Sequence, residues 1–155
     1  MLDSKYAARL VCLVPLFFSF GCNQLGVKKE QETEKPDLLV IQEQADQAYL
    51  NNDLAAGEQH YLTLVQELPD IPLHWFRLAN IYVRTNRPAA AIGLYREALL
   101  RDPKYAKAWL NLSIVQLKQS AYSLNEMLLY TDKEDPRYDK GKKLLEGIQK
   151  IIQEN

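Results

Sequence analysis

The chain has 155 residues, of which 47% are hydrophobic and 25% are charged, and its formal net charge is -1. This composition is that of an ordinary globular protein, and the length predicts one folded domain. Because neither sign of charge clusters along the chain, the sequence argues against nucleic-acid binding and against a polybasic segment at a membrane surface.

The N-terminal segment, residues 1–21, differs in character from the rest of the chain. Lys5 and Arg9 form a short positive region, residues 10–20 form an apolar run, and Gly21-Cys22 follows before the chain turns polar. This is the layout of a secretory signal peptide. The apolar run is interrupted by Pro15 and is too short to span a membrane, which needs about 20 residues. The sequence therefore predicts an exported protein with a signal peptide at residues 1–21.

Ser19-Phe20-Gly21-Cys22 resembles the lipobox of bacterial lipoproteins, although Ser19 and Phe20 depart from its preferred residues. In that family the signal is cut before the cysteine, which then carries acyl chains such as palmitate. The resemblance implies lipidation of Cys22 and anchoring in a membrane, since several acyl chains hold a protein there stably. Asn23 replaces the aspartate that retains such proteins in the inner membrane, which implies the periplasmic face of the bacterial outer membrane.

Cysteine usage agrees with this interpretation. Cys12 lies within the signal peptide, so Cys22 would be the one cysteine of the mature chain. One cysteine cannot form an internal disulfide. A metal site needs several ligands, and His60 and His74 are distant in the sequence. We therefore expect no metal ion and no cofactor.

Residues 22–36 comprise the acylated cysteine and a polar, charged segment without hydrophobic periodicity. Such a composition is typical of a flexible tether. A chain of this length extends on average about 20 Å. We expect the folded domain, residues 37–155, to lie just off the membrane surface.

From residue 38 onward, helix-forming segments alternate with turns rich in Asn, Asp and Pro. No segment alternates apolar and polar residues as a half-buried strand would. The sequence therefore predicts an all-α fold. The expected helices cover residues 41–50, 54–68, 73–85, 88–101, 105–119, 122–130 and 137–153.

Pro69 and Pro103 are separated by about 34 residues, and a period of this length is typical of stacked helix pairs. We call the spacing from position 69 to position 103 the repeat period. Residues 72–105 resemble one tetratricopeptide repeat. Its signature positions are occupied by Trp75, Leu78, Ala79, Tyr82, Ala91, Tyr95, Ala98 and Pro103. Residues 38–71 and 106–136 match the repeat less fully. The resemblance implies an α-solenoid of about three helical hairpins with a C-terminal capping helix at residues 137–153.

The matched residues also have a packing explanation. Trp75, Leu78 and Ala79 share one helix face with Tyr82, so we expect this face to lie in the core and not to bind a ligand. The last helix carries an apolar stripe that suits a cap on the stack, and a partner-binding helix is the alternative. The stripe comprises Leu144, Leu145, Ile148, Ile151 and Ile152.

A second stripe on the first helix of each hairpin is the candidate binding site. In the tetratricopeptide family these positions line a peptide-binding groove. The candidate residues are Leu73, Phe76, Asn80, Val83, Arg84, Lys107, Leu110, Ile114 and Lys118. Several are more apolar than a solvated face requires, which indicates an interaction site. The alternative is that the C-terminal helix covers them.

Catalytic motifs are missing from the sequence. It contains no nucleophile elbow, metal-ligand cluster or Gly-rich phosphate loop. His60 and His74 fall in different repeats, each directly before an expected core aromatic, so we expect both at the surface. The sequence therefore predicts a binding protein and not an enzyme.

The expected partner is a protein that is bound as a helix or as an extended apolar segment. Gln42 and Asp46 occupy positions at which carboxylate-clamp members of the family have Lys and Asn, which argues against recognition of a chain terminus. A lipid-anchored domain of this kind resembles the pilotin-type and assembly lipoproteins of pilus, tight-adherence and secretion systems. That resemblance implies a secretin or another envelope-complex subunit as partner. The alternatives are an adaptor for peptidoglycan hydrolases or outer-membrane protein assembly, and a structural subunit that self-associates through its last helix.

Overall fold

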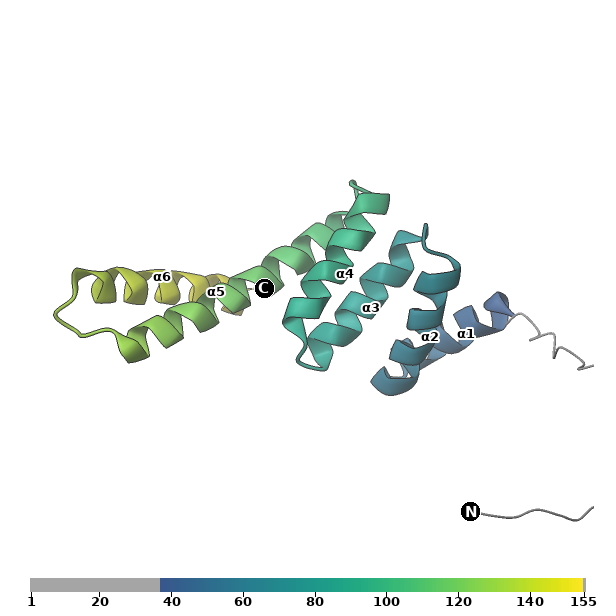
Figure 1. The fold of residues 1–155 in the computed structure, drawn as a ribbon, viewed down its shortest axis with the longest axis horizontal. Coiled ribbons are helices and arrows are strands. Elements are labelled where there is room, and N and C mark those ends of the chain that lie inside the picture. Colours follow the sequence, from purple (N-terminus) through teal and green to yellow (C-terminus); the bar gives the residue numbers. More distant parts are fainter. Residues whose placement is uncertain (1–36, 155) are drawn as a thin grey trace, which may run out of the picture. The chain divides into compact units, whose positions relative to one another are not determined.

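The computed structural model describes residues 37–154. The predicted signal peptide, Cys22 and the tether lie outside the described residues. The described part contains six helices and no strand, and each helix packs against the next in the chain (Figure 1). The helices are α1 (Leu38–Leu50), α2 (Leu54–Glu67), α3 (Pro72–Arg84), α4 (Pro88–Arg101), α5 (Ala106–Tyr130) and α6 (Pro136–Gln153). The all-α stack predicted from the sequence is confirmed.

The starts of the helices are set by aspartate and proline. The carboxylates of Asp37, Asp53 and Asp135 accept hydrogen bonds from backbone N–H groups of the first turns of α1, α2 and α6, the shortest in each being 3.0, 3.1 and 2.8 Å long. These N–H groups would otherwise have no partner within the helix. Proline stands at the start of α3, α4 and α6, where its missing N–H is not needed.

The first two hairpins turn on asparagine residues in the left-handed backbone conformation. Asn52 follows α1 with φ of 63°, and Asn86 follows α3 with φ of 58°. Asparagine adopts this conformation more readily than other residues with a Cβ. The two asparagines lie one repeat period apart, so the turn itself is part of the repeat.

We expect Asn86→Ala to lower the free energy of unfolding by about 1 kcal/mol, because alanine at positive φ is strained. Asn86→Gly is the matched control and should be nearly neutral, since glycine adopts this conformation without strain. Urea-induced unfolding followed by circular dichroism measures both variants. Equal stability of the two variants would show that the turn does not depend on its backbone conformation.

Two clusters of buried side chains hold the stack together. The first lies between α1, α2 and α3 and contains Ala45, Tyr61, Leu64, Val65, Leu78 and Ile81. The second lies between α3, α4 and α5 and contains Ala79, Ala91, Tyr95, Ala98, Leu99, Ala108, Leu112 and Val115. Trp75, Tyr82 and Leu94 are partly buried and pack against both clusters. The core is therefore continuous from α1 to α5.

The break expected between residues 119 and 122 is wrong, because α5 runs without interruption from Ala106 to Tyr130. The position one repeat period after Asn86 is Ser120, and its hydroxyl bonds to the carbonyl of Gln116 within the helix at 3.0 Å. Similarly, Tyr122 stands where Pro88 begins α4. Since neither a left-handed asparagine nor a proline is present, nothing ends the helix at this point.

The third hairpin therefore consists of α5 and α6, and α6 is the C-terminal helix that packs against α5. In Figure 1, α6 folds back along the second half of α5. Leu145 of α6 is buried. Gly141 lies so close to α5 that a Cβ there would meet the side chain of Met127. Gly141 thus permits the close approach of the two helices.

None of the six helices could cross a membrane, because none between residues 37 and 154 combines the length and the apolar character that this requires.

Candidate protein-binding groove

A hollow of about 340 Å³ lies on the side of the stack formed by the first helices of the hairpins. We call it the α3–α5 groove. It is lined by Tyr49, Asn80, Val83, Arg84, Tyr95, Asn111, Ile114 and Val115. The lining combines branched apolar side chains with amides and one guanidinium, so it offers both apolar contacts and hydrogen bonds.

The structure places the predicted groove residues in different surroundings. Asn80, Val83, Arg84 and Ile114 line the α3–α5 groove. Leu110, Ile114 and Lys118 line a neighbouring hollow together with residues near the end of α6. Leu73, Phe76 and Lys107 line neither hollow.

Phe76 belongs to the core instead. Its ring packs against the rings of Tyr95 and Tyr105, with centroid distances of 6.0 and 4.9 Å. It also contacts the second buried cluster. Phe76 thus supports the wall of the groove with a ring that is partly buried.

The end of α6 borders one part of the predicted stripe. Ile151 and Ile152 lie beside Leu110, Ile114 and Leu117 of α5 in the neighbouring hollow. No residue of α6 lines the α3–α5 groove itself. The C-terminal helix therefore flanks the site at Ile114 and leaves the part near Val83 to a ligand.

Three of the polar side chains that line the groove join neighbouring repeats. The hydroxyl of Tyr95 donates to Oδ1 of Asn80 at 2.6 Å, and Nδ2 of Asn111 donates to the same oxygen at 2.8 Å. Burial raises the pKa of Tyr95 to about 12, so the phenol keeps its proton. These bonds fix both amides, because a buried polar network holds its members in one arrangement.

The same arrangement occurs one repeat earlier with different residues. The hydroxyl of Tyr61 donates to Oδ1 of Asp46 at 2.6 Å, and Arg77 donates both to that carboxylate and, at 2.7 Å, to the Tyr61 oxygen. Asp46, Tyr61 and Arg77 each precede by one repeat period the corresponding member of the Asn80, Tyr95 and Asn111 set. We call the two sets polar triads. They were not predicted from the sequence, although their members recur at the repeat period.

A third polar triad does not form. The positions one further repeat period along are Ile114, Leu129 and Leu145, which carry no hydrogen-bonding side-chain atom. The ladder of polar side chains therefore ends at Ile114, where the lining of the α3–α5 groove becomes apolar.

Positive charge remains at the rim of the groove. Arg84 is exposed, lies 5.6 Å from the ring centroid of Tyr49 and donates to the side-chain oxygen of Asn52. Lys118 is exposed beside Val83 and Val115. The ion pairs found among residues 37–154 include neither Arg84 nor Lys118. These two charges therefore favour a ligand that carries an acidic group next to apolar ones.

Comparison with protein families matches residues 43–99 and again residues 76–138 to the tetratricopeptide repeat family. The two matches together cover more than half of the chain. The chain belongs to the tetratricopeptide repeat family. Members of this family are generally scaffolds for protein–protein interaction and not enzymes. A comparison with curated proteins found no similar sequence.

The tetratricopeptide match explains the polar triads as an interface between successive repeats. Residues 76–99 fall in both matches, and this stretch supplies Asn80 and Tyr95, which hold Asn111 of the following helix. The second match continues through the uninterrupted helix α5 into the start of α6. The family pattern therefore persists in residues where the expected turn has been lost.

His74 is buried, which corrects the surface position expected for it. Its side chain has a relative exposure of only 2%. Nε2 lies 2.5 Å from Oε1 of Gln42, so α3 is linked to α1 at this point. Burial is the largest cause that lowers the pKa of His74. His60, in contrast, is half-buried on α2. His74 therefore has a structural role within the tetratricopeptide stack.

The stability of the protein should depend on His74 in mildly acidic solution. Because its folded-state pKa lies below the unfolded value of 6.5, the neutral ring contributes stability that is fully present above pH 6.5. That stability is lost as the pH falls from 6.5 through the folded pKa. Urea unfolding of wild type between pH 7.5 and about 5 should show this decline, and His74→Gln should make the profile flatter. A profile that His74→Gln leaves unchanged would contradict this role.

A metal centre finds no support in the described residues, because between residues 37 and 154 no three His, Cys, Asp or Glu side chains lie close enough together to hold an ion.

Proposed function

We propose that this protein is a membrane-tethered adaptor that holds a segment of a partner protein in the α3–α5 groove. The observation that carries the proposal is the apolar pair Val83 and Ile114, which faces the groove between amides that the second polar triad fixes. Accessible apolar side chains next to preset hydrogen-bonding groups suit the recognition of a peptide segment. Membership of the tetratricopeptide repeat family supports the same class of function.

The chemistry of the groove restricts the kind of segment it accepts. Val83, Ile114 and Val115 offer apolar contacts, which a helix or an extended strand would meet with apolar side chains on one face. Arg84 lies at the rim without a carboxylate within ion-pairing distance among residues 37–154. A segment with an acidic residue beside its apolar face would therefore fit best.

Photo-crosslinking in cells tests this proposal. A photoreactive residue replaces Val83 or Ile114 in the groove, and the matched control carries it at Gln66, which is exposed on α2 and lines no part of the groove. We expect positions 83 and 114 to capture the same partner and position 66 not to capture it. Absence of a groove-specific adduct at both positions would overturn the proposal.

We further propose that Cys22 is lipidated and anchors the domain to the periplasmic face of the outer membrane. The support lies in the sequence alone: a signal-like segment, Gly21-Cys22 and the neutral Asn23 that follows. The charged stretch up to Pro36 would then let the adaptor turn to meet a partner near the membrane.

The leading specific role is that of a pilotin-type or assembly lipoprotein of a pilus or secretion system. This rests on the combination of an anchor with a tetratricopeptide domain, which is an analogy of architecture. Identification of the crosslinked species by mass spectrometry separates the roles. A secretin supports the pilotin-like role, a peptidoglycan hydrolase or a barrel-assembly component supports an envelope adaptor, and adducts with itself alone support a structural subunit.

A further inference from the structure

A second groove runs between α4 and α5 on a different face of α5. At one end it is lined by Gly93, Arg96, Glu97, Leu99 and Leu100 of α4 and by Trp109 of α5. It continues past Ile92 to Gln116 and Gln119. We call it the α4–α5 groove. Its position in the stack corresponds to the groove between α2 and α3, one repeat earlier.

In that earlier position, α4 lies across α3 and contacts the turn between α2 and α3 through an arginine near its C-terminal end. The guanidinium of Arg101 lies 4.3 Å from the ring centroid of Trp75. Its Nε also donates to the backbone carbonyl of Pro69, which accepts a second hydrogen bond from the Trp75 indole at 2.7 Å. One arginine is thus held by both a ring face and a carbonyl.

A leucine and a second arginine complete the docking of α4. Leu94, near the middle of α4, packs against the first buried cluster. Arg87, just before α4, donates to both carboxylate oxygens of Glu58 at 2.7 and 2.5 Å and lies 3.9 Å from the ring centroid of Tyr82. The helix is therefore held by an arginine at each end and a leucine between them.

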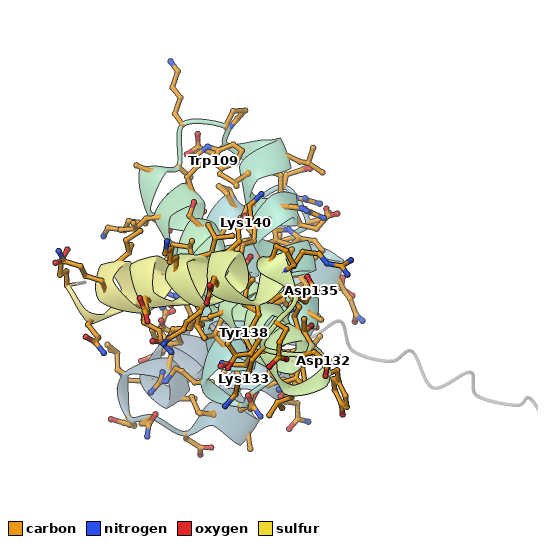
Figure 2. The ribbon with its side chains drawn as sticks, turned by 90° about the vertical axis from the view of Figure 1, so that its left-hand side faces the viewer. Trp109, Asp132, Lys133, Asp135, Tyr138 and Lys140 are labelled. Atoms are coloured by element: carbon orange, nitrogen blue, oxygen red, sulfur yellow. The ribbon has the colours of Figure 1, made fainter. Side chains whose placement is uncertain are left out.

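The α4–α5 groove contains a tryptophan and a proline carbonyl equivalent to those at the Trp75 end of the groove between α2 and α3. Trp109 and Pro103 lie one repeat period after Trp75 and Pro69, and the Trp109 indole donates to the Pro103 carbonyl at 3.0 Å. Yet Trp109 is 52% exposed and its neighbour Leu100 is 74% exposed. In Figure 2, Trp109 lies at the edge of the stack and α6 does not cross over it. Arg96 lines the same hollow as Trp109, but none of the cation–ring contacts found within residues 37–154 involves Trp109, whereas Arg101 lies over Trp75.

The other end of the α4–α5 groove differs from the corresponding end of the groove between α2 and α3. Ile92 stands where Glu58 would be, and Gln116 stands where Tyr82 would be. An arginine equivalent to Arg87 would find neither a carboxylate nor an aromatic ring at this end. The groove therefore accepts a cation at the Trp109 end only.

The chain's own next segment is unsuited to this groove. At the repeat spacing, Asp132 would replace the buried Ala98, and Asp135 would replace Arg101 next to the tryptophan. Asp135 instead begins α6, where it accepts hydrogen bonds from Arg137. Burial of one carboxylate and the loss of the arginine would both disfavour docking.

We propose that the α4–α5 groove binds an amphipathic helix of a partner protein. This helix would occupy the position that corresponds to α4 one repeat later in the stack. This helix carries an arginine near its C-terminal end that covers Trp109 and donates to the Pro103 carbonyl. It carries an apolar residue two turns earlier, as Leu94 does in α4, and a neutral residue at its start. The proposal goes beyond the adaptor function of the α3–α5 groove, because the two grooves share no lining residue.

A peptide with the sequence of residues 87–101 tests this groove in trans, because α4 is the chain's own example of the ligand. The peptide is labelled with fluorescein at its N-terminus, and its binding to the full chain is followed by fluorescence anisotropy. We expect Arg101→Ala in the peptide to raise the Kd about tenfold, as loss of a cation–π contact and a hydrogen bond would. Arg87→Ala is the matched control and should change the Kd less than about twofold.

Substitutions in the full chain locate the bound peptide. Trp109→Ala and, as a second variant at an exposed position, Leu100→Asp should each raise the Kd about tenfold. Ile114→Glu, in the α3–α5 groove, should leave the Kd unchanged. The proposal is overturned if no peptide binds, if both peptide arginines matter equally, or if Ile114→Glu alone abolishes binding. It is also overturned if sedimentation velocity shows dimers that Trp109→Ala dissociates, because a second copy would then be the occupant.

Discussion

Replacing Trp75 with alanine is expected to lower the free energy of unfolding by about 3 kcal/mol, as for a large aromatic side chain in a core. Trp75 packs against both buried clusters, so its loss opens the junction between the two repeats. The substitution also removes the hydrogen bond to Pro69 and the ring on which Arg101 lies. Urea-induced unfolding followed by circular dichroism measures the change.

Trp109→Ala is the matched control, since Trp109 makes the same indole–carbonyl bond one repeat later. Its ring is 52% exposed, and no helix among residues 37–154 covers it as α4 covers Trp75. We therefore expect a loss of only about 1 kcal/mol, near the centre of the range for single substitutions. Equal losses for the two variants would show that α4 adds nothing to the packing of Trp75, and would contradict the assigned order of the stack.

Cys22→Ser is expected to abolish lipidation and to leave an uncut precursor that no longer localises to the outer membrane. Serine offers no thiol for the first acyl chain, and the loss of all chains removes the anchor. Metabolic labelling with a palmitate analogue, combined with membrane fractionation, measures acylation and position together.

Cys12→Ser provides the control for this experiment. Cys12 lies within the predicted signal peptide, so its replacement should leave labelling, cleavage and membrane retention at wild-type levels. Normal processing of the Cys22→Ser variant, or loss of labelling in Cys12→Ser, would refute the assignment of Cys22 as the lipidated residue.

The helices and their order could be predicted from the sequence because the turns of the first two hairpins carry local signals. Asn52 and Asn86 adopt left-handed conformations that few other residues tolerate. The error came at Ser120, where the repeat period predicted a turn that the residue itself does not form. The repeat period alone does not produce a turn where the residue at that position continues the helix.

The interior of the candidate site was harder to predict, since it depends on contacts between distant residues. His74 was expected at the surface from its place before Trp75, but its partner Gln42 lies far away in the sequence, on α1. Phe76 shares a helix face with Asn80, yet its ring reaches Tyr105 and joins the core. A single helix pattern does not show which neighbour covers such a face.

The polar triads could have been predicted from the sequence. Tyr61 and Tyr95 lie at the same repeat position, as do Asp46 and Asn80. Comparison of polar residues across the repeat period would have paired them. The apolar and small residues at the repeat positions indicate the core, whereas the bonds that orient the groove come from the polar residues between them.

Affinity purification from solubilised membranes tests most directly whether the protein works as an adaptor through the α3–α5 groove. The bait is the full chain as wild type, as Ile114→Glu, or as Leu39→Glu, a control in which an exposed apolar residue outside the groove becomes acidic. Quantitative mass spectrometry should show a partner enriched by wild type and Leu39→Glu and reduced at least about tenfold by Ile114→Glu. Equal recovery of that partner with Ile114→Glu would contradict the proposed function.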